Sequence, residues 1–315
     1  MKVLRAPLLC GLALFSLGFA AGEPKDAPKL PGYSVVALER GGMNRLALSA
    51  RLEGEPILFL VDTGAALSAI DRASVKKFQL EPPPDRRIPR QRTLNGRKAD
   101  VVWLRDFRIG EMKLGGLPMM VMPAGKHFAD YKNGTLHGLL GADVLHLYQA
   151  VLDCGSGRIF FKTDPNVKVD LAGTLRAAGF RAVPLQQRHG HYYVECKLRK
   201  FPFSLLVDTG AFVTLLKREN IELFGVRSEE TKLKQRSLNG TAAEVRLVPP
   251  EEHQLSIAGM PLRQPVGATH DPMLNRALGD GELGILGLDL LAANGAIIDF
   301  ESLMLYLRPP RAERN

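Results

Sequence analysis

The sequence predicts a mainly β protein that is built from two similar halves. Segments from the first part of the chain return later at a nearly constant distance, which indicates an internal repeat. The residues that lead into these segments have the patterns of β-strands, and each half carries an Asn-Gly pair typical of a tight hairpin turn. We expect only short helices, after Gly141, after Gly287 and near Ser74–Phe78.

The repeated segments keep their register along the chain. FLVDTGA at Phe59–Ala65 returns as LLVDTGA at Leu205–Ala211, an offset of 146 residues. GLLGAD at Gly138–Asp143 returns at the same offset as GILGLD, whereas QRTLNG at Gln91–Gly96 returns as QRSLNG at an offset of 144. The offset thus falls from 146 to 144 and then returns to 146. An offset that is restored in this way indicates two copies of one fold rather than chance similarity.

The repeat also suggests how the chain is divided. We expect a first lobe at 33–162, a linker at 163–181 and a second lobe at 182–309. Residues 1–22 have a short basic start, an apolar run and small residues at the end, which is the layout of a secretory signal peptide. The run is shorter than the ~20 apolar residues that span a bilayer, so a cleaved signal is favoured over an anchor. We expect export to the periplasm or beyond.

Two segments of the first half show the strand patterns clearly. Leu46–Leu52 alternates between its two faces, and Ile57–Val61 is a continuous apolar run. The first pattern is typical of a half-buried strand, and the second predicts a strand that is buried on both faces.

The composition argues against some classes of function. The net charge is +9, but lysines and arginines are scattered and no nucleic-acid-binding motif is present, so we expect no nucleic-acid partner. No phosphate loop, Ser-His-Asp order or zinc motif is visible, and we expect neither a metal nor a cofactor. Cys154 and Cys196 leave two alternatives open, a disulfide bond or two buried thiols.

Each DTGA segment places a carboxylate at the end of an apolar strand, at Asp62 and Asp208. A lone buried carboxylate is costly because its charge loses water. Two carboxylates held close cannot both ionise easily, so the pair keeps one proton. The ionised member can take a proton from a water while the other donates one to a substrate carbonyl oxygen. Asp62 and Asp208 are therefore candidate catalytic residues for amide hydrolysis.

The neighbours of both aspartates suit such a site. Threonine hydroxyls can hydrogen-bond across to the opposite loop, and glycine backbones can approach the carboxylates and donate N–H groups. Because the alanine after each glycine has no hydroxyl to stabilise an ionised carboxylate, we expect a weakly acidic optimum rather than a strongly acidic one. The supporting residues are Thr63, Gly64, Ala65, Thr209, Gly210 and Ala211.

Other polar residues are interpreted as structural. Asp143 and Asp153 return as Asp289 and Asp299, and we expect these aspartates to cap short helices and to end strands. The segment His189–His191 has no matching pair in the first half and no nearby carboxylate cluster. A turn before a strand is therefore favoured over a metal site.

The motifs together resemble those of the retropepsin-like aspartic peptidases, in the form found in bacterial secreted proteins. The shared pattern is DTGA after an apolar strand, an Asn-Gly hairpin, and then apolar-apolar-Gly, present twice. The resemblance implies that Asp62 and Asp208 are catalytic, that each half is a small closed β-barrel and that substrate lies between the halves. It also implies flaps that close over the substrate, formed by the hairpins at Asn95, Gly96, Asn239 and Gly240.

The chain departs from that family in its organisation. Retropepsins are usually homodimers with one motif per chain, whereas this chain has two and so resembles pepsin as a single-chain pseudo-dimer. Pepsin-like enzymes prefer Ser or Thr where this chain has Ala65 and Ala211, and they carry a flap tyrosine that neither hairpin has. The resemblance is therefore closer to the retropepsins.

The sequence thus predicts an aspartic endopeptidase that acts on protein or peptide substrates and is active as a monomer. One alternative is a catalytically inactive protein that binds peptides on the same scaffold. A second is an enzyme that trims a single dedicated partner. A third arrangement, in which each half pairs with the same half of another chain, is disfavoured by the short linker.

Overall fold

The computed structural model describes residues 30–41, 45–94, 97–123, 135–228, 232–236, 242–279 and 281–309. The expected signal peptide at 1–22 and the four expected flap residues, Asn95, Gly96, Asn239 and Gly240, lie outside these ranges. Residues 33–162 are called the first half of the chain, and residues 182–309 the second half.

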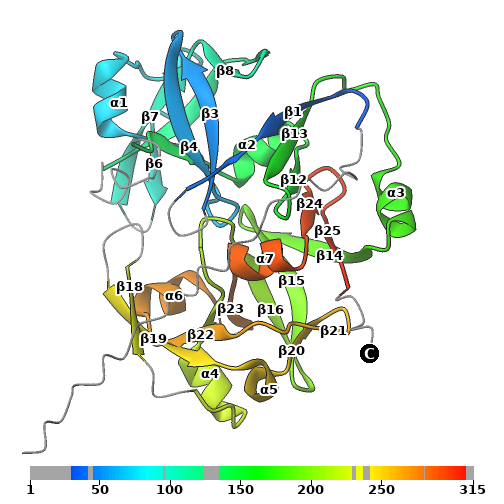
Figure 1. The fold of residues 1–315 in the computed structure, drawn as a ribbon. Coiled ribbons are helices and arrows are strands. Elements are labelled where there is room, and N and C mark those ends of the chain that lie inside the picture. Colours follow the sequence, from blue (N-terminus) through cyan, green and yellow to red (C-terminus); the bar gives the residue numbers. More distant parts are fainter. Residues whose placement is uncertain are drawn as a thin grey trace, which may run out of the picture.

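The described chain is mainly β with short helices, as the sequence predicts (Figure 1). The strands of the first half are β1 (Tyr33–Ala37), β2 (Glu39–Arg40), β3 (Leu46–Leu52), β4 (Glu55–Val61), β5 (Ala69–Asp71), β6 (Gln91–Leu94), β7 (Arg97–Leu104), β8 (Phe107–Ile109), β9 (Met112–Leu114), β10 (Leu117–Met122), β11 (Gly138–Leu140), β12 (Val151–Asp153) and β13 (Arg158–Lys162). Its helices are α1 (Arg72–Lys77) and α2 (Ala142–Leu147).

Helix α3 (Leu171–Ala177) lies between the halves in sequence. The strands that follow are β14 (Arg181–Arg188), β15 (His191–Leu198), β16 (Phe201–Val207), β17 (Leu215–Lys217), β18 (Lys232–Arg236), β19 (Ala242–Val248), β20 (Leu255–Ile257), β21 (Met260–Pro261), β22 (Val266–Thr269), β23 (Glu282–Leu286), β24 (Ile297–Asp299) and β25 (Met304–Leu307). The helices of the second half are α4 (Arg218–Leu223), α5 (Pro250–His253), α6 (Pro272–Ala277) and α7 (Leu288–Ala293).

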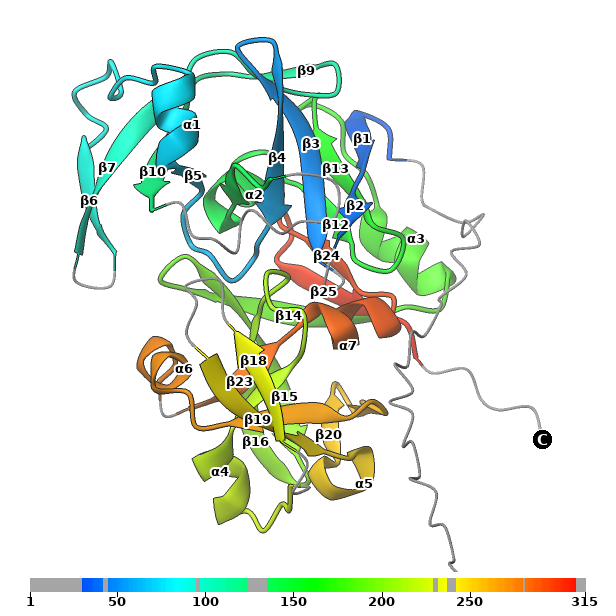
Figure 2. The same ribbon diagram turned by 60° about the vertical axis from the view of Figure 1, so that its left-hand side comes forward.

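Two curled sheets organise these strands (Figure 2). The first has the order β6-β7-β10-β5-β11-β4-β3-β8-β9, with β2 beside β3, and lies wholly in the first half. The second has the order β1-β13-β12-β24-β25-β14-β15-β16-β23-β17-β22-β19-β18, with β20 beside β15 and β21 beside β20. Since β1, β12 and β13 come from the first half, this second sheet connects the two halves.

The connection between the halves is symmetric about one strand pair. Strands β12 and β24 are copies of one another, and they pair antiparallel with Leu152 opposite Ile298. These two residues are related by the repeat offset, so an approximate two-fold axis passes between them. In Figure 1 this pair lies between the body that contains β3 and β4 and the body that contains β15 and β16.

The apolar core is continuous across the molecule. One large cluster of buried side chains includes Phe59 and Leu152 from the first half and Ile298 and Leu305 from the second. Burial of apolar area is the main favourable term in folding, so this shared core holds the two halves together. Cys154 and Cys196 are both buried free thiols, which decides between the two alternatives that the sequence left open.

The elements expected from sequence are present. Leu46–Leu52 is β3, and the last five residues of β4, Ile57–Val61, are all buried. Helices α2 and α7 follow Gly141 and Gly287 as expected. Helix α1 begins two residues earlier than predicted, because the Asp71 carboxylate caps it and accepts hydrogen bonds from the N–H groups of Ala73 and Ser74.

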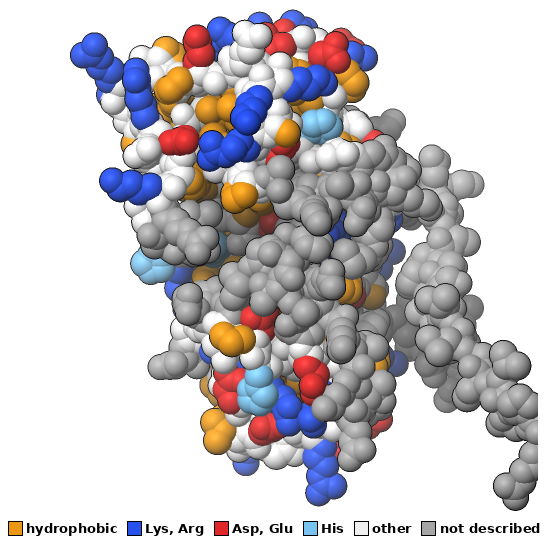
Figure 3. Space-filling model, turned by 90° about the vertical axis from the view of Figure 1, so that its left-hand side faces the viewer, with side chains coloured by type: hydrophobic (Ala, Val, Ile, Leu, Met, Phe, Trp, Pro, Cys, Tyr) orange, Lys and Arg blue, Asp and Glu red, His pale blue; other side chains and the backbone are white. Residues whose placement is uncertain are grey.

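The described surface is mixed in character. On the face shown in Figure 3, lysine and arginine side chains are dispersed among acidic, apolar and neutral ones. Among the residues that the structure describes, no helix has the length and apolar character needed to cross a membrane.

Candidate active site

Two loops, one from each half, meet at the centre of the molecule. The Asp62 loop (62–68) follows β4, and the Asp208 loop (208–214) follows β16. In each half a third strand lies between the strand before the loop and the strand after it, in the orders β4-β11-β5 and β16-β23-β17. The same strand arrangement therefore delivers both aspartates to equivalent positions.

The inserted strands hold the start of each loop. The N–H of Asp62 donates to the carbonyl of Leu140 at 3.0 Å, and the N–H of Asp208 donates to Leu286 at 3.0 Å. Leu140 and Leu286 belong to the repeated apolar-apolar-Gly segments, so the structure brings these segments beside the loops. The following glycine must stay small: a Cβ at Gly141 would lie 2.7 Å from the carbonyl oxygen of Ala65.

Each carboxylate accepts hydrogen bonds from its own loop. Asp62 Oδ1 accepts from the N–H groups of Gly64 at 3.0 Å and Ala65 at 3.1 Å. In the second half, Asp208 Oδ1 accepts in the same way at 2.9 and 3.0 Å from Gly210 and Ala211. The supporting role that the sequence predicts for these backbone N–H groups matches this geometry. In the described part of the chain, the N–H groups of each loop bind Oδ1 alone and leave Oδ2 of the same carboxyl group free of bonds from its own loop.

The two threonines lock the loops to each other. Thr63 Oγ1 donates to the carbonyl of Val207 at 2.7 Å and accepts from the N–H of Thr209 at 3.0 Å. Thr209 Oγ1 makes the reciprocal pair, donating to Val61 at 2.8 Å and accepting from the N–H of Thr63 at 3.1 Å. Both threonines are completely buried. These four bonds fix the relative position of the two loops.

The two carboxyl groups lie face to face as a result. A Cβ built on Gly64 would lie 2.4 Å from Cγ of Asp208, and one built on Gly210 would lie 2.5 Å from Cγ of Asp62. Real side chains do not approach so closely, so only glycine fits at either position. The carboxyl groups of Asp62 and Asp208 also hydrogen-bond to each other.

This arrangement changes the acidity of both groups. Burial raises the pKa of Asp62 well above its ordinary value, and the neighbouring charge and hydrogen bond of Asp208 raise it further. Burial also raises the pKa of Asp208, while the N–H groups of Ala211 and Gly210 and the hydrogen bond from Asp62 oppose that rise. The pair therefore keeps one proton at a pH where isolated aspartates would both be ionised.

Asp143 and Asp289 have a different role from the one predicted. The N-caps of α2 and α7 are Gly141 and Gly287, so the aspartates lie within the first turn and do not cap. Asp143 Oδ1 instead accepts from the N–H of Ser68 at 2.9 Å and its hydroxyl at 2.6 Å. Asp289 binds Thr214 in the same way at 2.9 and 2.8 Å. These aspartates anchor the far end of each loop.

The other repeated pair is structural, as predicted. Asp153 ends β12 and accepts from the hydroxyl of Ser156 at 2.7 Å. Asp299 ends β24 and accepts from the hydroxyl of Ser302.

A small apolar cluster flanks each loop. The cluster in the first half packs against Ala65 and Leu67, and the cluster in the second half packs against Ala211 and Val213. Several members correspond through the repeat: Ala47 with Tyr193, Leu60 with Leu206, Ala69 with Leu215, and Leu139 with Ile285. The dyad thus has apolar walls on both sides.

One residue near the dyad was not foreseen from the sequence. His189–His191 was expected to form a turn, and the structure confirms a turn between β14 and β15. The unforeseen feature is that the ring of His191 interacts with the backbone of Gly64, and that the charges of His191 and Asp208 affect each other's pKa. The internal repeat contains a signal for this position, because His191 precedes Asp208 by the same 17 residues that separate Arg45 from Asp62. Both residues are therefore at equivalent positions relative to a candidate catalytic aspartate.

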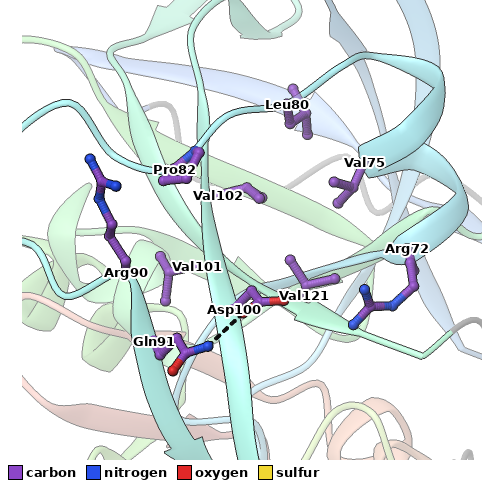
Figure 4. Close-up of a pocket in the computed structure, with 10 residues that line it drawn as sticks. All are labelled: Arg72, Val75, Leu80, Pro82, Arg90, Gln91, Asp100, Val101, Val102 and Val121. Carbon is purple, nitrogen blue, oxygen red and sulfur yellow. Dashed lines mark hydrogen bonds between the residues drawn. The ribbon is translucent and has the colours of Figure 1, made fainter.

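A separate cavity of about 600 Å³ lies in the first half (Figure 4). Arg72 and Arg90 lie on opposite sides of it, with valine side chains between them. Gln91 Nε2 donates to Asp100 Oδ1 at 3.0 Å at its edge. None of its lining residues belongs to the Asp62 loop or the Asp208 loop.

Comparison with known proteins gives one family match. Residues 48–144 match a family model described as aspartyl protease. The fold is aspartic-protease-like. The matched range contains Asp62 but not Asp208. No curated protein sequence matches this chain significantly.

Several solved structures are similar to the chain. Basic 7S globulin from soybean is 13% identical, with 88% of this chain and 94% of that chain covered and a TM-score of 0.46. Conglutin gamma, a basic 7S globulin from lupine seeds, is 13% identical, with 89% and 95% covered and a TM-score of 0.45. A retropepsin-like aspartic protease from Rickettsia conorii is 18% identical, with 43% and 96% covered and a TM-score of 0.31.

Proposed function

We propose that this chain is an aspartic endopeptidase in which Asp62 and Asp208 form one catalytic dyad. The observation that carries the proposal is the reciprocal hydrogen bonding of Thr63 and Thr209, which places the two carboxyl groups against each other. A decayed site would not need two buried, desolvated carboxyl groups, because burying charge is costly. The raised pKa values of the pair support the same conclusion.

The chemistry follows from the shared proton. The ionised carboxylate takes a proton from a water held between the two groups, and the water oxygen attacks the scissile carbonyl carbon. The protonated carboxyl group donates to the carbonyl oxygen, so a neutral tetrahedral diol forms. The carboxyl group that took the proton from water then gives it to the leaving nitrogen, while the other carboxylate takes a proton from a hydroxyl of the diol, and the C–N bond breaks. The products are a carboxylic acid and an amine. The dyad again holds one proton, so one water is consumed for each peptide bond.

The substrate is a peptide or protein segment that binds between the two apolar clusters. These clusters flank both loops and offer apolar walls to side chains on either side of the scissile bond. Each half would form a closed lobe, and the hairpins around Asn95-Gly96 and Asn239-Gly240 would act as flaps. Both dyad members come from one chain, so the enzyme is active as a monomer, a single-chain pseudo-dimer.

Export from the cytoplasm is part of the proposal. It rests on the basic, apolar and small-residue pattern of residues 1–22. The two-lobed form with one DTGA segment per lobe also supports assignment to the retropepsin-like peptidases of secreted bacterial proteins.

The test is cleavage of a mixed peptide library by the purified protein from about pH 3 to about pH 8, where carboxyl dyads titrate. Asp62→Asn and Asp208→Asn are the test variants, since each keeps the shape of the side chain but cannot ionise. Asp153→Asn is the matched control, because Asp153 is a repeated, buried aspartate that binds Ser156 outside the site.

We expect the wild type and the Asp153 control to cleave and both dyad variants to lose at least about a hundredfold in rate, the size of a general acid–base contribution. Cleavage that persists in one dyad variant would mean that the halves act separately. If folded wild-type protein cleaves nothing, the proposal fails and a peptide-binding protein on this scaffold becomes the better hypothesis.

A further inference from the structure

The turn between β14 and β15 reaches from the second half to the Asp62 loop. Gly190 lies in this turn with φ +81°, and a Cβ built on it would be 3.0 Å from Cβ of Ala66. The two halves therefore contact each other here as well as through the threonines. The contact places the next residue, His191, at the border between the two loops.

His191 begins β15 at this border. Its ring interacts with the backbone of Gly64, and a Cβ built on Gly64 would lie 2.4 Å from Cγ of Asp208. The ring is therefore on the side of the Asp62 loop that meets the Asp208 carboxyl group. The charge of His191 lowers the pKa of Asp208, whereas His191 is not among the groups that shift the pKa of Asp62. Among the described residues, the buried Nδ1 atom of His191 has no hydrogen-bond partner.

The first half carries a different side chain at the equivalent position. Arg45 precedes His191 by the repeat offset, is 5% exposed, and has its guanidinium carbon 5.9 Å from the ring centre of Phe212. Phe212 is itself the repeat counterpart of Ala66. In each half, therefore, the residue at this position interacts with the loop of the other half. One of these residues is a permanent cation and the other is titratable, so the repeat is electrostatically unequal here.

The remaining charges around His191 are balanced or turned away. Arg188, its partner in the β14–β15 ladder, pairs with Glu282 at 2.7 Å and stacks on the ring of Tyr193 at 3.9 Å. His189 is exposed and adds a weak repulsion when charged. Among the charged side chains, Asp208 therefore has the largest effect on the pKa of His191, after burial and the backbone of Gly64.

We propose that His191 is a positioning residue that sets the roles of the two aspartates: its imidazolium lies beside Asp208, makes Asp208 the ionised base and leaves the shared proton on Asp62. This inference rests on the proposed function, because it assigns the roles within the same dyad. Without such a group, the near-symmetry of the two loops would leave the proton free to occupy either side.

The direction of the pH effect follows from the charges. Partial burial lowers the pKa of His191, while the Gly64 carbonyl and the Asp208 charge oppose that fall. A positive charge beside a carboxyl pair favours loss of its first proton. Removing that charge therefore raises the pH at which the dyad becomes singly ionised. The acid limb of the activity profile should move to higher pH in a variant that lacks the charge.

The first experiment compares pH profiles of kcat and kcat/KM for the wild type, His191→Gln and His191→Arg. Gln keeps a donor for the Gly64 carbonyl but no charge, and Arg restores the permanent cation that the first half carries. We expect the acid limb to move up by about one pH unit in His191→Gln, the usual effect of a nearby charge, and to return in His191→Arg. His189→Asn, on the same turn, should leave the profile unchanged.

The second experiment does not require activity and separates the two proposals. The titration of the His191 ring is followed by NMR in the full-length protein, with Asp208→Asn and Asp62→Asn compared. We expect Asp208→Asn to lower the pKa of His191 by about one unit and Asp62→Asn to leave it nearly unchanged. Equal responses to the two substitutions would overturn the inference, whether or not the protein cleaves peptides. An active wild type with an unshifted His191→Gln profile would overturn it while leaving the proposed function intact.

Discussion

The exchange of Thr63 for valine tests how the two halves are held together. Valine has nearly the volume of threonine, so the substitution removes the hydroxyl without opening a cavity. The hydroxyl oxygen of Thr63 makes two bonds, one to the carbonyl of Val207 at 2.7 Å and one from the N–H of Thr209 at 3.0 Å. Both bonds are buried, and both cross from one half to the other.

The expected loss can be worked from these contacts. A buried hydrogen bond contributes about 1 kcal/mol net, and a buried group left without its partner costs about 1–3 kcal/mol. Thr63→Val removes two bonds and leaves the N–H of Thr209 unpaired, so we expect a loss of about 2–4 kcal/mol in the free energy of unfolding. Peptide cleavage should also fall, because the carboxyl groups of the dyad are positioned by the same bonds.

Urea-induced unfolding and peptide cleavage measure the two effects. Thr174→Val is the matched control, since Thr174 is exposed and its hydroxyl makes one bond to the carbonyl of Asp170. We expect that control to change the free energy of unfolding by less than about 0.5 kcal/mol, as is usual for surface positions. Thr63→Ser, which keeps the hydroxyl, should retain most of both properties. The reasoning is refuted if Thr63→Val is as stable and as active as the Thr174 control.

Three further outcomes are expected at the site. Asp208→Asn should raise the melting temperature at pH 7. The pKa of Asp208 is higher in the folded state than in the unfolded state, so the wild-type protein loses stability as the pH rises through that pKa, and Asn does not ionise. The gain, about 1.4 kcal/mol for each pKa unit, should vanish below about pH 4, where unfolded aspartate is also protonated. Calorimetry at both pH values checks this, and a gain that persists in acid would contradict it. Gly64→Ala should abolish cleavage, because its Cβ would lie 2.4 Å from Cγ of Asp208, whereas Gly115→Ala, with open space around it, should stay active in the same assay. The rate profile of the wild type should peak in weakly acidic solution, since Ala65 and Ala211 offer no hydroxyl to the carboxylates; a maximum well below about pH 4 would refute this.

Much of the fold could be predicted because its signals are local or repeated. Alternation in Leu46–Leu52 and the apolar run in Ile57–Val61 are strand patterns that tertiary packing did not override. The start of α1 was missed by two residues, because the capping carboxylate of Asp71 decides it rather than apolar spacing. The role of Asp143 was also missed, since helix capping is a local rule and its bond to Ser68 joins positions far apart in the chain.

By itself the sequence determined the β class, the division into two similar halves and the pairing of Asp62 with Asp208 as candidates, because identical motifs in constant register require equivalent places in one fold. Only the tertiary structure decided which atoms meet: the β12–β24 pair on the approximate axis, the approach of each glycine to the opposite carboxyl group, and the position of His191 against the Asp62 loop. The physical reason is separation along the chain. Periodicity reports the surroundings of a residue within a few positions, whereas these contacts join residues more than a hundred positions apart, and only the closed geometry of the two halves brings them together.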